Sequence, residues 1–282
     1  MSRKFIINAD DFGLCEGVNR AVFKAHTEGV LTSATIMTNT AGSDDAVKLS
    51  KSMPSLGVGI HLNLTEGIPI TKNNQIKKLT GSSGEFALSP GKLFFLSMLN
   101  PKIKETIKSE LEAQIQWLVE RDIKPTHIDS HKHIHTIPAI FKIVIELAEK
   151  YDISAIRLPI EHSKFQRGYW PKSSKKGKVR SKIISSLAKF NKLQNSKYFK
   201  TDAFLGIAHT GQINLALFRA VSLRSSISVI EIMTHPGFTE GLDPAKTRLL
   251  QQREDELNTL CSEQVRLYFE KAGIELIHYG QL

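Results

Sequence analysis

Five side chains able to bind a metal ion occupy alternate positions in one short stretch of the sequence: His127, Asp129, His131, His133 and His135. Alternate residues of a β-strand point to the same face of a sheet, so this spacing predicts a single polar row. Imidazole is the commonest metal ligand in proteins and titrates closest to neutral pH. Because one ion needs only three or four protein ligands, we expect some members of the row to bind it and others to orient those ligands.

Two adjacent carboxylates, Asp10 and Asp11, come at the end of an apolar segment that begins at Phe5. Neighbouring carboxylates on a buried segment repel each other unless a cation lies close to them. One of the pair could coordinate that cation while the other stays free to accept a proton. The alternative is that the two residues begin a turn or cap the next helix, as Asp often does.

Three further candidates lie where other apolar segments end. His61 stands on the polar face of an alternating segment, and His235 precedes Pro236, which favours an extended backbone before it. Arg157 could bind substrate oxygens or a catalytic carboxylate. The alternatives are a structural role for His61, a solvent-exposed turn for His235 and a surface ion pair between Arg157 and Glu161.

Together these residues contain the groups that metal-assisted hydrolysis requires. A carboxylate and two imidazoles could hold an ion, a spare carboxylate could activate water, and a spare histidine could protonate the leaving group. One oxygen and two nitrogen ligands suit zinc, manganese, cobalt or iron better than magnesium.

The elements that must position these groups alternate along the chain. Apolar, β-branched segments predict strands at residues 4–9, 32–37, 57–64, 126–130, 155–158, 204–207, 229–233 and 275–278. Helical spacing of apolar residues predicts amphipathic helices at 18–27, 102–121, 137–150 and 213–223. We expect one α/β domain over residues 1–282, with a mostly parallel sheet. Seven or eight such units favour an irregular (β/α) barrel. A polar surface loop is expected at 71–89.

The net charge of +10 is concentrated in one basic insertion, residues 164–200, which holds twelve Lys or Arg and no Asp or Glu. A cationic amphipathic helix within it could sit on an anionic membrane surface or on nucleic acid. The alternative is a solvated lid that packs on the main domain, since charge alone indicates only non-specific attraction.

The composition also excludes several classes of protein. A run of about 18 apolar residues is absent, and the N-terminus lacks a secretory signal, so we expect a cytoplasmic protein. Only two cysteines occur, so we expect neither a disulfide framework nor a thiolate zinc site. Glycine-rich nucleotide-binding motifs are absent as well.

The motifs taken together resemble those of the YdjC-like (ChbG/HpnK) carbohydrate deacetylases. The segments that carry the resemblance are Asn8-Ala-Asp10-Asp11-Phe-Gly-Leu, Gly29-Val-Leu-Thr-Ser-Ala-Thr, Gly59-Ile-His61-Leu-Asn-Leu-Thr65-Glu66-Gly67, Pro125-Thr-His127-Ile-Asp129-Ser-His131-Lys-His133-Ile-His135 and Met233-Thr-His235-Pro-Gly. They occur in the family's order from residue 4 onward, and nothing is transferred to the basic insertion.

The resemblance implies a polysaccharide-deacetylase-like (β/α) barrel that removes acetyl groups from N-acetylated sugars, such as chitooligosaccharides or the sugar of a glycolipid. It also implies metal ligation by Asp11, His61 and His131, with water activated at the metal attacking the acetamide. Magnesium is the metal that the resemblance implies, against the preference of the donor set for Zn²⁺ or another transition metal.

By the same resemblance Asp10 would be the general base, and His235 the acid that protonates the departing amine. Asp129 and His133 could orient a ligand or contact substrate, and so could Arg157.

Two other functions remain open at this point. A metal-dependent phosphoesterase on a related barrel could use the surplus histidines for further ions. A protein that binds anionic lipid or nucleic acid through residues 164–200 is the other alternative, although no specific nucleic acid is expected. The sequence leaves a homodimer open.

Overall fold

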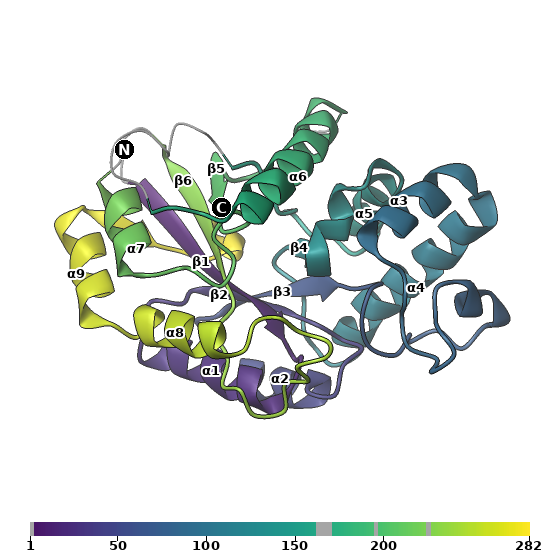
Figure 1. Ribbon diagram of the computed structural model, residues 1–282, viewed down its shortest axis with the longest axis horizontal. Coiled ribbons are helices and arrows are strands. Elements are labelled where there is room, and N and C mark those ends of the chain that lie inside the picture. The colour runs from purple at the N-terminus through teal and green to yellow at the C-terminus, as the bar shows by residue number, and fades with distance from the viewer. Residues whose placement is uncertain (1–2, 162–170, 195–196, 224–226) are drawn as a thin grey trace.

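The computed structural model describes residues 3–161, 171–194, 197–223 and 227–282. Its centre is a parallel sheet made of the strands β1 (Arg3–Phe12), β2 (Ser33–Ile36), β3 (Gly57–Leu62), β4 (Ile128–Ser130), β5 (Ala203–Leu205), β6 (Val229–Thr234) and β7 (Ile274–Leu276). The strand order is β4-β3-β2-β1-β6-β5, and β7 pairs with the start of β1 (Figure 1). Because the strands are parallel, their carboxyl ends meet at one edge of the sheet, where the candidate residues were expected.

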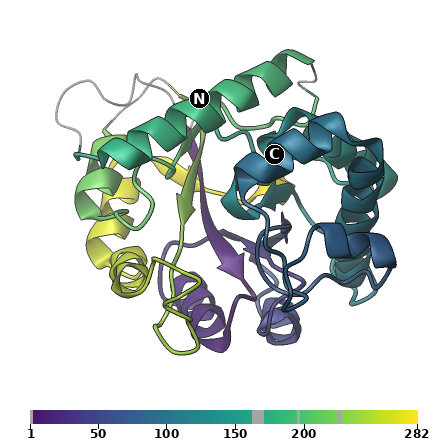
Figure 2. The same ribbon diagram turned by 45° about the vertical axis from the view of Figure 1, so that its right-hand side comes forward.

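The helices surround this sheet, as Figure 2 shows. They are α1 (Glu16–Thr27), α2 (Ser43–Lys51), α3 (Pro90–Leu99), α4 (Pro101–Val119), α5 (Pro138–Lys150), α6 (Lys175–Gln194), α7 (Leu215–Ser222), α8 (Gln251–Leu260) and α9 (Glu263–Lys271). The predicted apolar stripe of α4 is fully buried, from Ile103 to Leu118. The predicted alternation of strands and helices is therefore confirmed.

The sheet curls into a half-barrel, and a closed barrel is not shown. Between β4 and β5 the predicted strand at 155–158 is not formed. The chain there makes only isolated bridges, from Ile156 to Ile128 and from Glu161 to Phe204. Pro159 contributes to this interruption, because proline has no N–H to donate to a sheet.

The predicted row of histidines on one strand is wrong. β4 ends at Ser130, and residues His131–Thr136 form a short 3₁₀ helix, η2, in which Lys132 and His133 have positive φ angles of 54° and 56°. The alternation of side chains on a strand is lost in this turn, so the four histidines point into different surroundings.

The expected loop at 71–89 also carries some structure. It contains the 3₁₀ helix η1 (Asn74–Lys78) and a bridge between Thr80 and Phe86. Ile76, Leu79 and Phe86 are buried, so the apolar residues of this segment anchor it to the core.

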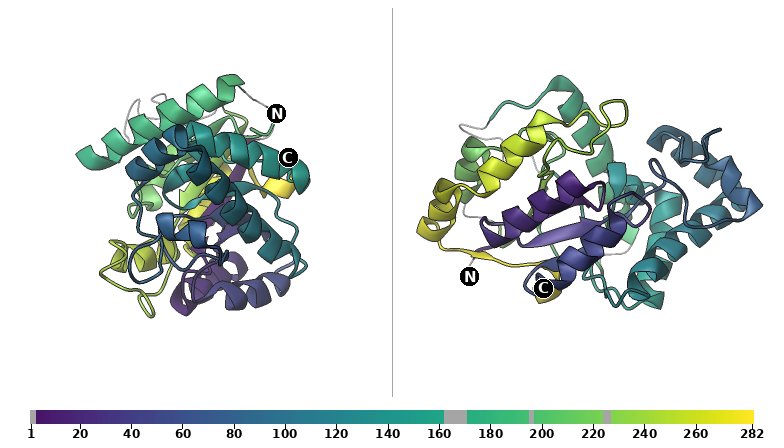
Figure 3. Two further views of the ribbon diagram at one scale, coloured as in Figure 1. Left: turned by 90° about the vertical axis from the view of Figure 1, so that its right-hand side faces the viewer. Right: turned by 90° about the horizontal axis from the view of Figure 1, so that it is seen from below.

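Within the described ranges, none of the helices combines the length and the hydropathy needed to cross a bilayer. Residues 162–170 and 195–196 of the basic insertion lie outside the described residues, and α6 makes up most of the described part of the insertion. Figure 3 shows α6 passing along the outside of the molecule, with no other helix beyond it.

Candidate metal and catalytic site

The two adjacent carboxylates stand at the end of β1, where the strand becomes irregular. The register with β2 shifts between Ala9 and Phe12, and Asp11 has a φ angle of +65°. Successive side chains of a strand already point in opposite directions. As a result Asp10 and Asp11, although neighbours in sequence, contact two different groups of residues.

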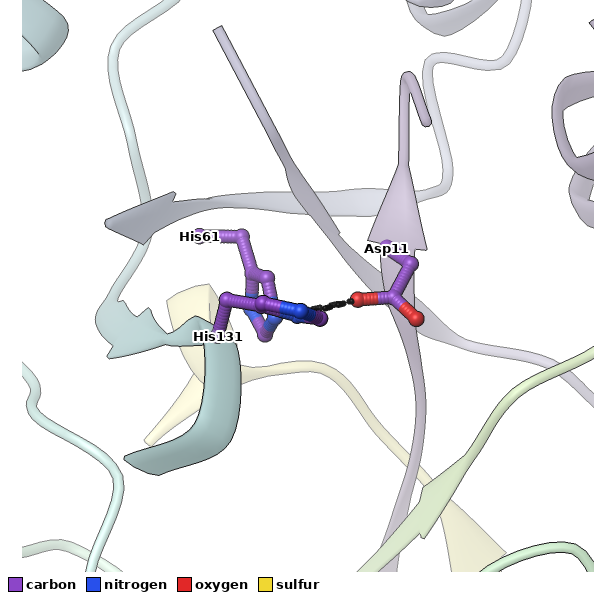
Figure 4. Close-up of side chains that lie close together, drawn as sticks. All are labelled: Asp11, His61 and His131. Carbon is purple, nitrogen blue, oxygen red and sulfur yellow. Dashed lines mark hydrogen bonds and ion pairs between the residues drawn. The ribbon is translucent and has the colours of Figure 1, made fainter. Parts of the chain in front are cut away.

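Asp11 meets two histidines from distant parts of the chain (Figure 4). His131 Nδ1 lies 2.9 Å from Asp11 Oδ1, and His61 Nε2 lies 3.4 Å from the same oxygen. The three side chains come from β1, β3 and η2, and their ligand atoms lie within 4.8 Å of one another. Two imidazole nitrogens directed at one carboxylate oxygen form a nitrogen and oxygen donor set suited to a divalent ion.

Asp129 holds His61 in this orientation by pairing with Nδ1, the ring nitrogen that is not directed at Asp11. The Asp129 Oδ1 atom lies 2.6 Å from His61 Nδ1, and Thr35 Oγ1 lies 3.1 Å from the same nitrogen. Burial alone would lower the pKa of His61, but the carboxylates of Asp129, Asp11 and Asp10 together outweigh it and raise the pKa to about 10. A carboxylate that fixes the outer nitrogen of a metal-binding histidine is a recurrent arrangement in metal sites.

A second cluster able to hold an ion, Asp10 with His61 and Asp129, is less suited to that role. The carboxylates of Asp10 and Asp129 already pair with the guanidinium of Arg157, at 2.6 Å in each case. A divalent ion placed there would face that positive charge directly. In the first cluster Arg253 pairs only with Asp11 Oδ2, while Asp11 Oδ1 faces the two imidazoles, so the first cluster fits a metal better.

Arg157 is fully buried beside these groups, so the alternative of a surface ion pair with Glu161 is wrong. Its Nη1 and Nη2 atoms donate to the two oxygens of Asp10, at 2.8 and 2.6 Å. Its Nε atom donates to Glu231 at 2.7 Å. Glu161 instead accepts the backbone N–H groups of Gly206 and Ala208 after β5.

Asp10 is consequently a fixed and ionised carboxylate. Burial alone would raise its pKa, but the Arg157 guanidinium outweighs that effect and holds the pKa of Asp10 well below its usual range. Asn8 Nδ2 donates a third hydrogen bond, 3.0 Å long, to Asp10 Oδ1.

Sequence reasoning missed the groups that support Arg157 and Asp11. Glu231 in β6 accepts a hydrogen bond from the hydroxyl of Tyr279, whose ring stacks on His127 at a centroid distance of 3.9 Å. Arg253 in α8 donates to Asp11 Oδ2 at 2.6 Å. A charged residue inside an apolar strand could have drawn attention to Glu231, whereas Arg253 lies in an ordinary polar helix.

His235 is buried at the end of β6 and not exposed in a turn. Its backbone N–H donates to Glu256 at 2.7 Å, while its Nδ1 atom has no hydrogen-bond partner. Burial lowers the pKa of His235 to about 4, so the imidazole is neutral at neutral pH.

The remaining histidines of the row lie away from Asp11. His135 Nδ1 pairs with Ser130 Oγ at 2.6 Å. His133 is buried near Phe204, with its Nδ1 unpartnered. Neither belongs to a group of ligand atoms that could hold an ion among the described residues.

A cavity of about 1100 Å³ opens onto Asp10, Asp11, His61, His131 and His235. Helix α6, the short helix η2, the start of α3 and residues 246–249 contribute to its walls, and His133 and Arg253 also line it. The predicted catalytic and metal-binding residues thus share one concave space large enough for a saccharide.

This arrangement defines a class: an α/β protein with a curled parallel sheet and a buried Asp-His-His cluster at the carboxyl edge of its strands. The chain belongs to the family described as YdjC-like protein, whose sequence profile matches residues 4–271.

Similar proteins include two bacterial carbohydrate deacetylases. The one from Brevibacillus brevis is 34% identical over 280 residues and covers 99% of each chain. The one from Clostridium beijerinckii is 30% identical over 279 residues, covering 99% of this chain and 100% of its own.

A crystal structure from Enterococcus faecalis, provisionally described as that of a cellobiose-phosphate cleavage protein, superposes with a TM-score of 0.76. It is 25% identical and covers 100% of this chain and 99% of its own.

Proposed function

We propose that this protein is a carbohydrate deacetylase that hydrolyses the acetamide group of an N-acetylated saccharide. The full-length similarity to carbohydrate deacetylases supports the activity. The observation that carries the proposal is the Asp11, His61 and His131 cluster, set beside the clamped Asp10 on the wall of one cavity.

Asp11, His61 and His131 would hold a single divalent ion. When bound, such an ion supplies Lewis acidity, which polarises a carbonyl and lowers the pKa of water. The donor set favours zinc, manganese, cobalt or iron, whereas the family resemblance implies magnesium. Asp129 orients His61, and Arg253 fixes the second oxygen of Asp11.

Asp10 is the proposed general base, and Arg157 positions it. The carboxylate remains ionised throughout the working range of pH and accepts the proton of the attacking water. A new C–O bond forms at the acetyl carbon, and the C–N bond breaks to release acetate and an amine.

His235 is the proposed acid that protonates the departing nitrogen. Because its imidazole is neutral in the resting protein, the proton that Asp10 takes from the attacking water must pass to His235 and from there to the departing nitrogen, which leaves both side chains as they began. The His235 side chain lines the cavity beside Asp10 and Asp11, which places its imidazole on the wall where the leaving nitrogen would lie.

The test is acetate release from a panel of N-acetylated saccharides, after chelation and addition of individual divalent ions. We expect activity to require an added ion and to depend on saccharide length. A fully chelated protein that keeps its activity, or one that releases no acetate from any saccharide with any ion, would contradict the proposal.

A phosphoesterase is not favoured by the structure. Such an enzyme would use the surplus histidines for further ions, yet among the described residues His127, His133 and His135 belong to no group of side chains that could hold an ion. Counting bound metal and assaying p-nitrophenyl phosphate in the same preparations separates the two: more than one ion per chain together with phosphate release would favour the phosphoesterase.

A further inference from the structure

Helix α6 carries an apolar stripe that is about half exposed, and two of its residues, Val179 and Ile183, also line the cavity. Val179, Ile183 and Phe190 are 58%, 58% and 49% exposed. At 100° per residue these positions fall within a narrow arc. They lie on the side of the helix opposite Ser181 and Ala188, which are buried against the protein. The stripe is therefore not the face that attaches α6 to the fold.

The same helix is strongly cationic. Residues 171–194 contain eight Lys or Arg and no Asp or Glu. Lys175, Lys178, Lys182 and Lys189 project beside the apolar stripe and are exposed. In the described part of the chain these four lysines form no ion pair. A helix with an apolar stripe flanked by unpaired lysines has the pattern of a segment that lies in a membrane interface.

Helix α3 extends this surface on the other side of the cavity. Phe95, Met98 and Leu99 are exposed there, although they are large and apolar. Both α3 and α6 contact α5 and η2, and both line the cavity that contains Asp11. In Figure 2 the two helices lie at the same end of the molecule. The two helices that carry these exposed apolar side chains thus both contribute to the cavity wall.

We propose that the α3 and α6 surface docks on an anionic lipid membrane. A second copy of this chain is a poor occupant, because two such α6 helices would bring seven positive charges against seven. The phosphates of a nucleic acid would pair with the lysines, but the exposed apolar stripe would stay in water. An anionic bilayer surface satisfies both, since lipid headgroups pair with the lysines and acyl chains accept the apolar side chains.

Docking in this way would turn the mouth of the cavity toward the lipid. That this cavity is a deacetylase site rests on the proposed function, whereas the docking itself does not. Membrane binding can therefore be measured without any assay of activity.

The experiment is co-sedimentation of the full-length protein with vesicles of phosphatidylcholine alone or mixed with phosphatidylglycerol. We expect binding to the anionic vesicles that weakens with added salt, and little binding to phosphatidylcholine. The triple variant Met98→Ser, Leu99→Ser, Phe190→Ser should reduce binding by about tenfold or more, because each change removes a large apolar side chain. The variant Lys178→Gln, Lys182→Gln, Lys189→Gln should lose both affinity and salt dependence.

Leu267→Ser in α9 is the matched control, since Leu267 is also a partly exposed apolar side chain on a helix. Circular dichroism establishes that each variant is folded. Equal binding of the wild type and both variants would overturn the proposal, as would binding to neutral vesicles alone or no binding at low salt. Binding of RNA in place of lipid, or salt-resistant dimers lost in the triple variant, would also overturn it.

The six substituted residues lie outside the cavity wall. Acetate release from a soluble saccharide should therefore persist in the folded variants. Loss of lipid binding with retained hydrolysis supports the docking surface, whereas an inactive wild type that still binds anionic vesicles contradicts only the proposed function.

Discussion

Arg157 donates a hydrogen bond to each carboxylate oxygen of Asp10, from Nη1 to Oδ2 at 2.8 Å and from Nη2 to Oδ1 at 2.6 Å. The same guanidinium contacts Asp129, which orients His61. One buried cation therefore fixes the proposed base and, through Asp129, one of the proposed metal ligands. Their relative positions are set by a rigid planar group and not by flexible side chains.

Replacing Asp10 by Asn should separate catalysis from metal binding. The amide keeps the size of the side chain but is not a base, so turnover should fall by about 10²–10⁴-fold. Because Asp10 is not one of the proposed ligands, metal affinity measured by calorimetry should change little. An Asp10→Asn protein that no longer binds the ion would show that Asp10 is a ligand.

The substitution His235→Ala should lower turnover, because it removes the proposed acid. A His235→Ala protein with full activity would show that His235 is not the acid.

The substitution Arg157→Lys should be damaging although it conserves the charge. Lysine cannot make the two parallel hydrogen bonds to Asp10, and it leaves Glu231 without its partner. We expect a loss of about 3–5 kcal/mol of stability, typical for a broken buried ion pair, together with a fall in kcat. Urea unfolding and steady-state kinetics measure the two effects. Arg121→Lys, which changes a surface pair with Asp44, is the control and should leave both unchanged.

The substitution Tyr279→Phe removes the hydroxyl that donates to Glu231, and Glu231 in turn pairs with Arg157. It should therefore weaken the positioning of Arg157 without touching it. Burial raises the pKa of Glu231 to about 7, and the Tyr279 hydroxyl helps to stabilise its ionised form. We expect kcat to fall several-fold with KM and metal affinity unchanged. The control Tyr151→Phe removes a tyrosine–glutamate contact at the surface.

If Tyr279 acts through Arg157 on Asp10, the effects should not be additive. Adding Tyr279→Phe to Asp10→Asn should then leave the residual turnover unchanged. A further loss of the same size in that background would show that Tyr279 acts elsewhere.

The sequence predicted those parts of the fold that depend on local periodicity. The apolar stripe of α4 is an example, since spacing on a helix directly determines which face is buried. The grouping of candidate residues at strand ends was also predictable, because parallel strands bring their carboxyl ends together. The Asp11, His61 and His131 cluster follows from this rule and from the family resemblance.

Other parts of the site could not be predicted, because they depend on tertiary contacts. Nothing local shows that Arg157 pairs with Asp10 and not with Glu161, four residues away. Tyr279 lies near the chain terminus and reaches Glu231 only because β7 pairs with β1. The alternating histidines predicted a strand, but two residues with positive φ turn the backbone into η2 at that point.

Asp129→Asn should weaken metal binding without removing a ligand. The carboxylate fixes His61 through Nδ1 and increases the basicity of the ring, so its loss should reduce metal affinity by about 10–100-fold. His61→Ala and His131→Ala should reduce affinity further, along with activity. Calorimetric titration with zinc and with magnesium compares the three variants. Equal affinity in wild type and Asp129→Asn would show that the pair plays no part in binding.

The buried His135 should make the metal-free protein less stable in acid. Burial lowers the pKa of His135 to about 3, against 6.5 for the free side chain. Below pH 6.5 the unfolded chain therefore binds a proton that the folded protein excludes, and stability falls as the pH drops toward the folded pKa. For this one group the loss between about pH 7 and pH 5 is about 2 kcal/mol. Urea unfolding of His135→Gln in the presence of chelator should show a correspondingly smaller loss over the same interval, whatever its stability at neutral pH. The control is His26→Gln, since His26 is a half-buried histidine of α1. A His135→Gln protein that loses as much stability as the wild type would exclude His135 as a source of acid sensitivity.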